Sequence, residues 1–365
     1  MQRLPASMLL PGMLVASNIY NSNGQLLIRS NTVLTEQIIL RIRGLPINSI
    51  YIKNLMLEDI HIPQIISEDT RVTVGQVLYH EVTNFLRSGI LGLERLKTEL
   101  DVLIDELILN KDTIVQLQDA RTFNDYTICH SVNVCILAVL TAIRMGYNQK
   151  QLRDFAMGAL LHDIGMFTID KAVLEKMGKL SPEETRIVQA HSENGFSTLR
   201  KIRDISTPAA HISYQHHERF DGQGYPRKLR SHEIHEYARI VSIADIYDAL
   251  ISDRPYRKGF LPHEVYEILM TLADKHIDRE ILNIFLETMA VYPIGTIVKL
   301  NTGEIGVVIQ VIPKLTFRPI LRILYDRHGN QPENSLEINL IEHLSIFVEK
   351  VLSDKEILEL KCFIS

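Results

Sequence analysis

The strongest constraint on this chain is an acidic residue carried into the apolar stripe of a helix. The run Phe155–Leu161 is apolar throughout and ends on the adjacent pair His162 and Asp163. Asp163 continues the apolar stripe three residues beyond Leu160, so helical spacing predicts a buried carboxylate. Burying a carboxylate costs several kcal/mol unless a positive partner meets it. A metal ion with the neighbouring imidazole would be that partner, although an isolated pair of this kind is more often a capped helix end with a solvated Asp.

A second aspartate and a cluster of histidines shift that balance towards a metal site. Asp245 lies within Ile240–Leu250, which is apolar nearly all round and is therefore predicted to be a buried helix. Eight of the 14 histidines fall within residues 130–235. Among them His216 and His217 are adjacent, and paired imidazoles suit a cation when they are neutral.

Two further histidines are ambiguous when each is taken singly. His130 shares a predicted helical face with Val134 and Leu137, where a satisfied core histidine is the commoner outcome. His191 follows a helix predicted to begin at Pro182 and is equally ambiguous. Taken together, the pattern comprises two buried aspartates and at least five candidate imidazoles on a helical scaffold, with no thiolates.

The composition limits the classes of protein to be considered. The chain has 365 residues, 46% of them hydrophobic, which is enough for two or three domains with real cores. A net charge of −5 argues against nucleic-acid polymers as partners, because they need a basic face. Three cysteines without a CxxC pair fit a reducing compartment and exclude a thiolate zinc site. The longest apolar run, 134–142, is too short to span a bilayer, and Pro11-Gly12 interrupts the apolar N-terminal stretch, so we expect a cytoplasmic protein without a membrane span.

Changes of pattern along the chain predict a mainly α protein in five segments. They are a small α/β regulatory module (1–56), a linker with long helices (57–118), an all-helical domain (119–292), a small β module (293–347) and a C-terminal helix (348–365). In the first segment, Asn23-Gly24 predicts a hairpin turn and Thr35 is expected to cap a helix over Glu36–Arg43. In the fourth, residues 296–309 predict a second hairpin.

The long helix predicted over Leu91–Gln118 carries apolar residues at 3-4 spacing. The repeat runs through Leu93, Leu96, Leu100, Leu103, Leu107, Asn110, Ile114 and Leu117. It indicates either a coiled-coil seam that pairs two chains, with Asn110 setting the register, or an amphipathic helix lying on its own domain. A homodimer through this seam is therefore one of two open predictions.

Four motifs, in order along Asp125–Phe285, resemble the HD-GYP family. They are His-Asp-Ile-Gly (162–165), His-His-Glu-Arg-Phe-Asp-Gly-Gln-Gly-Tyr-Pro (216–226), Ala-Asp-Ile-Tyr-Asp-Ala-Leu (244–250) and Asp-Arg-Pro-Tyr-Arg (253–257). Members of this branch of the HD metallohydrolases are phosphodiesterases that hydrolyse the bacterial messenger cyclic di-GMP. Four motifs together are far more specific than one, and they disfavour the reading of these residues as structural histidines.

The resemblance implies an all-helical HD-type metallohydrolase domain with two bridged metal ions. One ion would be held by His130, His162, Asp163 and Asp245, and the other by His191, His216 and His217, with Asp163 bridging both. Two divalent ions about 3.5–4 Å apart share a hydroxide, lower its pKa and neutralise a phosphodiester under in-line attack. Imidazole and carboxylate ligands without thiolates favour iron or manganese.

The loop Gly222–Pro226 and two arginines complete the candidate site. By resemblance the loop shapes the substrate pocket and a protein-docking surface, and the ring of Tyr225 is suited to pack on a guanine. The alternative is an ordinary Gly/Pro surface loop. The planar guanidinium groups of Arg254 and Arg257 suit phosphate oxygens, and the alternative for them is a pair of solvated side chains.

Two positions depart from the family pattern. Met166 stands where the family usually carries a lysine, which removes a cation expected near the substrate phosphate. Tyr126, four residues before His130, stands where members with a third metal carry a glutamate. Asp125 would lie about 140° off the ligand stripe of a regular helix. The sequence therefore predicts a binuclear rather than a trinuclear centre.

The leading functional prediction is a cyclic di-GMP phosphodiesterase that opens the ring to linear pGpG by means of a metal-bridging hydroxide. With two metals, the second cut to GMP is expected to be slow or absent. One alternative is a slow, metal-loaded domain that senses cyclic di-GMP and signals through its flanking modules, which Met166 favours. Another is a phosphodiesterase for a different cyclic dinucleotide, such as a mixed GMP–AMP ring, because the HD scaffold serves several phosphohydrolases.

Overall fold

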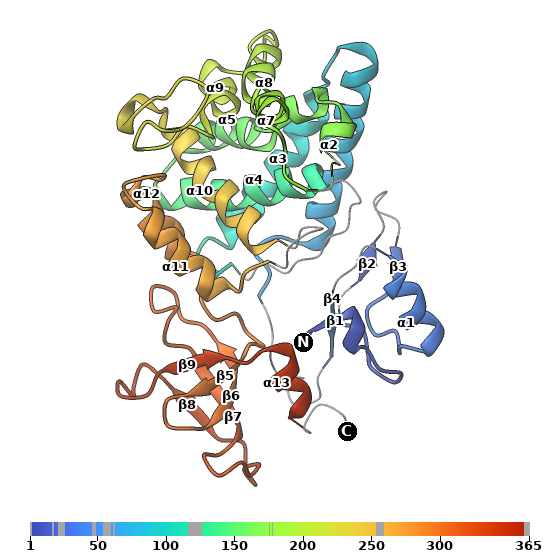
Figure 1. The fold of residues 1–365 in the computed structure, drawn as a ribbon, viewed down its shortest axis with the longest axis vertical. Helices are drawn as coiled ribbons and strands as arrows, with labels where there is room; N and C mark the ends of the chain where they lie inside the picture. Colours follow the sequence, from blue (N-terminus) through green and yellow to red (C-terminus); the bar gives the residue numbers. More distant parts are fainter. Residues whose placement is uncertain are drawn as a thin grey trace. The chain divides into compact units, whose positions relative to one another are not determined.

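The structure is a computed structural model. It describes residues 2–16, 18–20, 26–45, 49–53, 60, 63–115, 126–174, 176, 178–252 and 259–360. The chain divides into two compact units. The helical unit comprises residues 65–111 and 125–286, and the other unit gathers residues 1–64, 112–124 and 287–365. We describe each unit by itself (Figure 1).

The helical unit carries the candidate site. Its elements are α2 (Glu68–Ser88), α3 (Glu94–Leu109), α4 (Tyr126–Arg144), α5 (Gln149–Leu160), η3 (Ile164–Thr168), α6 (Lys171–Leu174), α7 (Pro182–Gln189), α8 (His191–Leu199), α9 (Thr207–Gln215), η4 (Ser231–Glu233), α10 (Glu236–Ile251), α11 (Pro262–Leu272) and α12 (Arg279–Leu286). The predicted mainly helical architecture is confirmed, including one long loop between α9 and α10.

Helix α4 forms the centre of this unit and packs against both α5 and α10. Its residues from Val134 to Leu140 are all fully or almost fully buried. Among the described residues, Thr127–Arg144 is one span with the length and composition of a membrane helix, at a mean hydropathy of 1.6. Because 72% of that span is buried inside the unit, its role as a core helix accounts for its apolar character.

Helix α5 delivers the His162-Asp163 pair, but not as a continued stripe. Asn148 caps the start of α5 through a reciprocal capping box with Gln151. The helix ends at Leu160, and Asp163 precedes the short 3₁₀ helix η3. The prediction that Asp163 extends the helical face of Leu160 is therefore wrong. The chain instead turns after Leu161, and that turn aims the carboxylate at the helices that follow.

Helices α2 and α3 belong to the helical unit and not to a linker. Ser67 accepts a hydrogen bond from the backbone N–H of Thr70 and caps α2, which starts at Glu68. Helix α3 covers Glu94–Leu109, shorter than predicted, and residues 116–118 of that prediction lie outside the described residues.

The apolar repeat of α3 faces its own unit. The predicted seam residues Leu93, Leu96, Leu100, Leu103 and Leu107 are buried, and α3 packs on α2, α4 and α5. Asn110 donates to the backbone carbonyl of Ile65. Of the two alternatives, the amphipathic helix on its own domain is the one observed. The alternative of a homodimer seam is not supported, because these leucines are already buried against helices of their own unit.

The N-terminal module is a small α/β arrangement, as predicted. Strands β2 (Ile19–Tyr20) and β3 (Leu26–Ile28) form the expected antiparallel pair, and the predicted turn residues 23–24 lie outside the described residues. Helix α1 (Glu36–Arg43) is capped by Thr35 and ends at Gly44. Strand β4 (Ser49–Ile52) pairs with β1 (Gln2–Pro5), a strand that sequence reasoning missed. The 3₁₀ turn η1 (Ala6–Met8) follows β1.

The C-terminal β module is an antiparallel sheet of five described strands in the order β8-β7-β6-β5-β9. The strands are β5 (Ile297–Leu300), β6 (Ile305–Gln310), β7 (Ile320–Tyr325), β8 (Glu337–Asn339) and β9 (Val348–Val351). The predicted 296–309 hairpin is confirmed by the pairing of β5 with β6. The segment 348–365 begins with β9, which pairs with β5. The C-terminal helix predicted in this segment, over Asp354–Lys361, is confirmed as α13 (Asp354–Glu359).

Candidate metal centre

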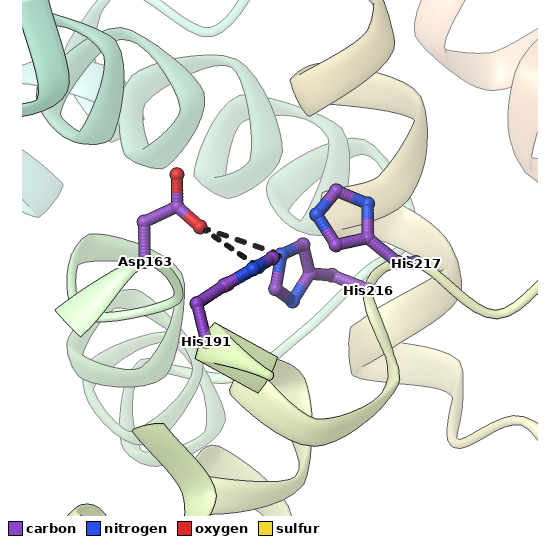
Figure 2. A group of neighbouring side chains, drawn as sticks. All are labelled: Asp163, His191, His216 and His217. Atoms are coloured by element: carbon purple, nitrogen blue, oxygen red, sulfur yellow. Dashed lines mark hydrogen bonds and ion pairs between the residues drawn. The ribbon is translucent and has the colours of Figure 1, made fainter. Parts of the chain in front are cut away.

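Seven side chains predicted from the motifs meet in one place in the helical unit. They form two groups, and within each group the ligand atoms lie within 4.8 Å of one another. One group is Asp163, His191, His216 and His217, and the other is His130, His162 and Asp245. The first group, drawn in Figure 2, combines the end of α9, the start of α8 and the turn after α5. We refer to them as the α8–α9 group and the α4–α10 group. Together they bring residues up to 115 positions apart in the chain (130 to 245) into one centre.

Asp163 lies between the two groups and presents one oxygen to each. Its Oδ1 is 3.4 Å from His191 Nε2 and 3.5 Å from His216 Nε2. Its Oδ2 is 3.5 Å from His162 Nε2 and 3.9 Å from His130 Nε2. A carboxylate divided in this way has the disposition of a bridging ligand.

Two glycines allow the α8–α9 group to assemble. A Cβ added to Gly165 would lie 1.9 Å from the carbonyl oxygen of His191 and 2.8 Å from the backbone nitrogen of Gly195. A Cβ on Gly158 would lie 2.7 Å from the carbonyl oxygen of Ala209 in α9. These approaches are too close for any side chain, so glycine brings η3 against α8 and α5 against α9. The glycine of the His-Asp-Ile-Gly motif is therefore a packing requirement of the site.

Backbone carbonyls orient three of the imidazoles. The Nδ1 atoms of His162 and His191 lie 2.9 Å and 2.6 Å from the carbonyl oxygens of Ala159 and Val188. His216 Nδ1 lies 3.0 Å from the carbonyl oxygens of Ile212 and Ser213. An Nδ1–H that donates to these oxygens leaves the Nε2 lone pair directed into the site, which is the tautomer a metal requires.

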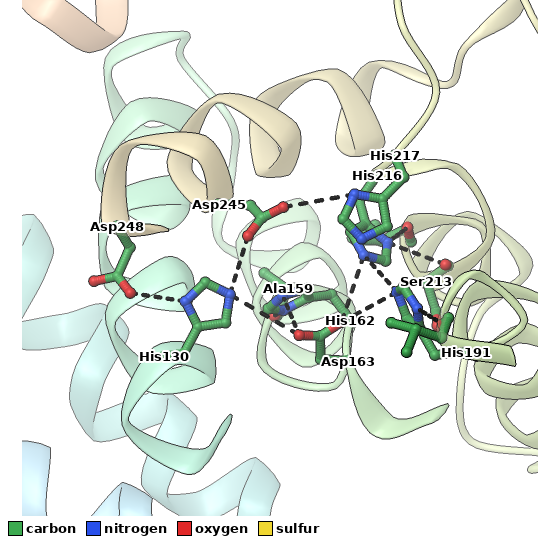
Figure 3. A network of polar contacts seen from close by, with 12 residues as sticks. His130, Ala159, His162, Asp163, His191, Ser213, His216, His217, Asp245 and Asp248 are labelled. Carbon is green, nitrogen blue, oxygen red and sulfur yellow. Dashed lines mark hydrogen bonds and ion pairs between the residues drawn. The ribbon is translucent and has the colours of Figure 1, made fainter. Parts of the chain in front are cut away.

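His130 is held differently, between two carboxylates of α10 (Figure 3). Its Nδ1 is 2.7 Å from Asp248 Oδ2 and its Nε2 is 3.0 Å from Asp245 Oδ1. Asp248 is almost fully buried, and sequence reasoning assigned it no role. Its signal was present, because a second acidic residue one helical turn after Asp245 in an apolar helix also requires a partner.

The electrostatics of the centre follow from burial and these contacts. Burial disfavours the charged form of Asp163, but the facing imidazoles of His162, His216 and His191 hold its pKa well below the usual range. Burial likewise opposes the charge of Asp245, and the hydrogen bond from His130 lowers its pKa nonetheless. Both carboxylates are therefore charged and ready to act as ligands.

The imidazoles divide into two classes. Burial lowers the pKa of His162 to about 4, and burial also lowers the pKa values of His191 and His217. Burial would lower the pKa of His130 too, but its hydrogen bonds to Asp245 and Asp248 raise it well above its ordinary value. His216 shows the same opposition, and its hydrogen bond to Asp163 raises its pKa.

One atom tests directly whether the site fits a metal ion. The Nε2 of His162 is buried, has no hydrogen-bond partner among the described residues, and faces Asp163 Oδ2 at 3.5 Å. A buried polar atom left unpaired costs about 1–3 kcal/mol. A divalent ion between the imidazole and the carboxylate satisfies this nitrogen, and the donor set of nitrogen and oxygen atoms suits such an ion.

The loop that follows His217 is closed by a buried carboxylate. Glu218 accepts hydrogen bonds from the backbone N–H groups of Arg227 at 2.7 Å and Leu229 at 3.0 Å. A Cβ on Gly224 would lie 2.6 Å or less from backbone atoms of residues 217–219, so the loop folds back on its own start. Tyr225 is thereby placed with its ring stacked on His217, at a centroid distance of 4.8 Å.

Family comparisons agree with this geometry. The sequence model of the HD domain matches residues 102–281. Residues 102–281 are therefore an HD domain. A KOW domain associated with HD domains matches residues 297–360, which include the C-terminal sheet and α13. HD domains bind divalent metals, so the family match and the histidine–aspartate cluster support a metal site in the HD domain.

Three curated relatives are named as phosphodiesterases of cyclic dinucleotides. The chain is 32% identical over 234 residues to a cyclic di-GMP phosphodiesterase of Pseudomonas aeruginosa, covering 63% of this chain and 56% of the relative. It is 33% identical over 195 residues to a cyclic di-GMP phosphodiesterase of Thermotoga maritima, covering 53% of this chain and 52% of the relative. A 3′3′-cGAMP-specific phosphodiesterase of Vibrio cholerae is 36% identical over 165 residues, with 45% and 35% covered. The family resemblance drawn from the motifs is confirmed, and the chain spans about half the length of the first two relatives.

Some predicted residues of the HD domain fall outside what the structure describes. Arg254 and Arg257 lie in the segment 253–258, and the side chain of Tyr126 is likewise not described. Met166 is half-buried in η3, three residues after Asp163. Two histidines of the long loop were expected at the surface from sequence: His232 is exposed, whereas His235 is half-buried and caps α10 by accepting from the Tyr237 N–H.

Proposed function

We propose that the HD domain hydrolyses cyclic di-GMP to linear pGpG with the help of two divalent metal ions. The observation that carries the proposal is the division of Asp163, with one carboxylate oxygen facing each group of imidazoles. His130, His162, Asp163 and Asp245 would hold one ion, and His191, His216 and His217 the other, with Asp163 shared. The names of the curated relatives support the same substrate class.

The chemistry then separates into what the ions supply and what the side chains do. When bound, the ions would supply Lewis acidity, which would lower the pKa of a bound water and neutralise negative charge on the phosphodiester. Asp163 fixes the spacing of the two groups because it contacts both. Four imidazoles, those of His130, His162, His191 and His216, keep their Nε2 atoms directed inwards through their Nδ1 contacts. Tyr225 places an aromatic ring beside His217, where it is suited to contact a base.

The proposal extends to the identity of the metal and to the compartment. Nitrogen and oxygen ligands without a thiolate favour iron or manganese. A chain with three cysteines and no CxxC pair fits the reducing cytoplasm. Arg254 and Arg257 remain proposed phosphate contacts, and the Gly222–Pro226 loop a proposed protein-docking surface, in both cases by family resemblance.

A test of the function begins with metal-free protein reloaded anaerobically with Fe²⁺ or Mn²⁺. Incubation with cyclic di-GMP and chromatography of the products is expected to show pGpG, with little GMP if two ions act. His162→Asn is expected to abolish ring opening, whereas the matched control His343→Asn, at an exposed histidine of the β module, is expected to leave it intact. Absence of ring opening with either metal would reject the enzyme, and rapid conversion to GMP would reject the two-ion form of the proposal.

Two alternatives have specific support. Met166 removes the cation usual at this position, which favours a domain that binds cyclic di-GMP and turns it over slowly. Tight binding without turnover, together with activity gained in Met166→Lys, would favour this alternative. The Vibrio cholerae relative is named for 3′3′-cGAMP, which favours a mixed ring as substrate. Competition between the two cyclic dinucleotides for one preparation of enzyme separates these substrates.

A further inference from the structure

A chain of hydrogen bonds connects the ligand group around His130 to helix α2. Arg71 Nη1 donates to Asn133 Oδ1 at 2.7 Å, and Asn133 Nδ2 donates to Asp248 Oδ1 at 3.0 Å. The other oxygen of Asp248 lies 2.7 Å from His130 Nδ1. Both oxygens of Asp248 are therefore engaged, one by the imidazole and one by the amide. The rotation of this carboxylate, and with it the ring of His130, is fixed from outside the centre.

The amide of Asn133 has two different ends, and the cation of Arg71 decides which end faces Asp248. With the amide oxygen bound to the guanidinium, the NH₂ group is directed at the carboxylate. A flipped amide would set its oxygen against the charged carboxylate and its NH₂ group against the cation. Arg71 therefore holds the only favourable orientation through a charge-assisted hydrogen bond.

The start of α2 is itself firmly anchored. Ser67, which caps the helix, donates from its backbone N–H and its Oγ to Glu106 of α3 at 2.6 Å and 3.0 Å. Thr70 Oγ1 donates to the same carboxylate at 2.6 Å. Arg71 follows Thr70 directly, so its backbone is held in place by α3. Helix α2 lies outside residues 102–281, the span that matches the HD domain.

We propose that Arg71 is a positioning residue for the ligand His130, acting through Asn133 and Asp248. The inference rests on the proposed function in so far as it assigns His130 to a metal. By this inference α2 supports the metal centre, although it precedes residues 102–281, which match the HD domain. Within the centre the relay acts on His130, because His162, His191 and His216 take their orientation from backbone carbonyls.

The test is anaerobic calorimetric titration of metal-free full-length protein with Mn²⁺. Arg71→Met is expected to weaken one of two Mn²⁺ sites by about 10-fold, the lower end of the range for residues that support ligands, and to spare the other. Arg71→Lys, which keeps the cation, is expected to recover part of the loss. Asn133→Leu is expected to cause the same loss of Mn²⁺ affinity as Arg71→Met. The double variant Arg71→Met/Asn133→Leu is expected to lose no more affinity than Asn133→Leu alone, because both residues act through one relay.

Arg153→Met is the matched control, because this arginine pairs with Asp101 at 2.6 Å on the surface of the same unit. It is expected to bind Mn²⁺ as the unaltered protein does. Should Arg71→Met fail to fold, Arg71→Gln replaces it. A second readout needs no metal: in ¹⁵N spectra of the histidine rings, Arg71→Met is expected to shift His130 and spare His216.

The outcomes separate the relay from the proposed function. Unchanged Mn²⁺ affinities and an unchanged His130 signal in the Arg71 variants would overturn the relay. Two Mn²⁺ ions bound without hydrolysis of any cyclic dinucleotide would reject the proposed function while the affinity comparison still decides the relay. If the unaltered protein binds no Mn²⁺, the ring spectra decide whether Arg71 positions His130.

Discussion

The two groups of ligands are built by different means. In the α8–α9 group, His191 and His216 are oriented by carbonyl oxygens of Val188, Ile212 and Ser213. In the α4–α10 group, His130 is oriented by the carboxylate of Asp248, which is held in turn by side chains. A backbone carbonyl cannot be mutated away, whereas every step of a side-chain relay can. The orientations of His191 and His216, and also of His162 in the α4–α10 group, are therefore protected by the fold, whereas the orientation of His130 is open to adjustment.

The largest effect is expected at Asp163, the residue that the two groups share. Asp163→Asn removes the charge that faces both, so both Mn²⁺ affinities and the rate of ring opening are expected to fall. The loss in turnover should exceed about 100-fold, the upper end for residues that only support a ligand. Calorimetry and chromatography measure the two effects. Asp105→Asn, at an exposed carboxylate of α3, is the control, and a variant that lost only one site would refute the bridge.

The next largest effect should distinguish the groups from each other. Asp248→Asn removes the charged acceptor of His130 and is expected to weaken one Mn²⁺ site by about 10–100-fold while leaving the other unchanged. Two-site analysis of a calorimetric titration shows the difference. An equal loss at both sites would mean that the groups are not independent.

A packing change addresses the group that the backbone protects. Gly165→Ala places a methyl group 1.9 Å from the carbonyl oxygen of His191, and η3 and α8 must move apart. We expect a loss of about 1–3 kcal/mol in the free energy of unfolding and a weaker α8–α9 site. Thermal denaturation and Mn²⁺ titration measure these effects. Gly44→Ala, where the nearest atom would lie at an ordinary 3.5 Å and φ is −83°, is the control expected to show neither.

The smallest expected effect is a difference in proton release. Despite burial, hydrogen bonds to Asp245 and Asp248 raise the pKa of His130, so this imidazole carries a proton that a metal must displace. His162, with a pKa of about 4, is neutral near pH 7, so its Nε2 has no proton for a metal to displace. Apparent metal affinity should therefore fall as the pH falls. Titrations in buffers of different ionisation enthalpy count the protons, and Asp248→Asn should release fewer because the pKa of His130 is then lower.

The seven residues predicted as metal ligands lie together in the structure, and motif order and burial both pointed to them. Sequence reasoning did not find Asp248 as a partner of His130, although its spacing from Asp245 on an apolar helix was visible. It also did not find Arg71, because nothing in a linear pattern indicates that the first turn of α2 contacts Asn133. Supporting residues are selected by tertiary contacts, which helical spacing does not encode.

The elements show the same division between local and tertiary information. Helix α1 was predicted to its ends because Thr35 and Gly44 are local signals. The short strands β1 and β9 were missed because each is defined by its partner, β4 and β5 respectively. The apolar face of α3 was recognised, but only packing on α2, α4 and α5 decides what it contacts.

The closed loop after His217 has a consequence for how such a domain can diversify. Glu218 accepts hydrogen bonds from the N–H groups of Arg227 and Leu229. The loop that starts at Glu218 is therefore closed at the carboxylate of its own first residue. Its exposed side chains Gln223 and Lys228 can be exchanged while the anchoring contacts stay the same. The exposed face of the loop can therefore change while the anchoring of the neighbouring histidines is kept.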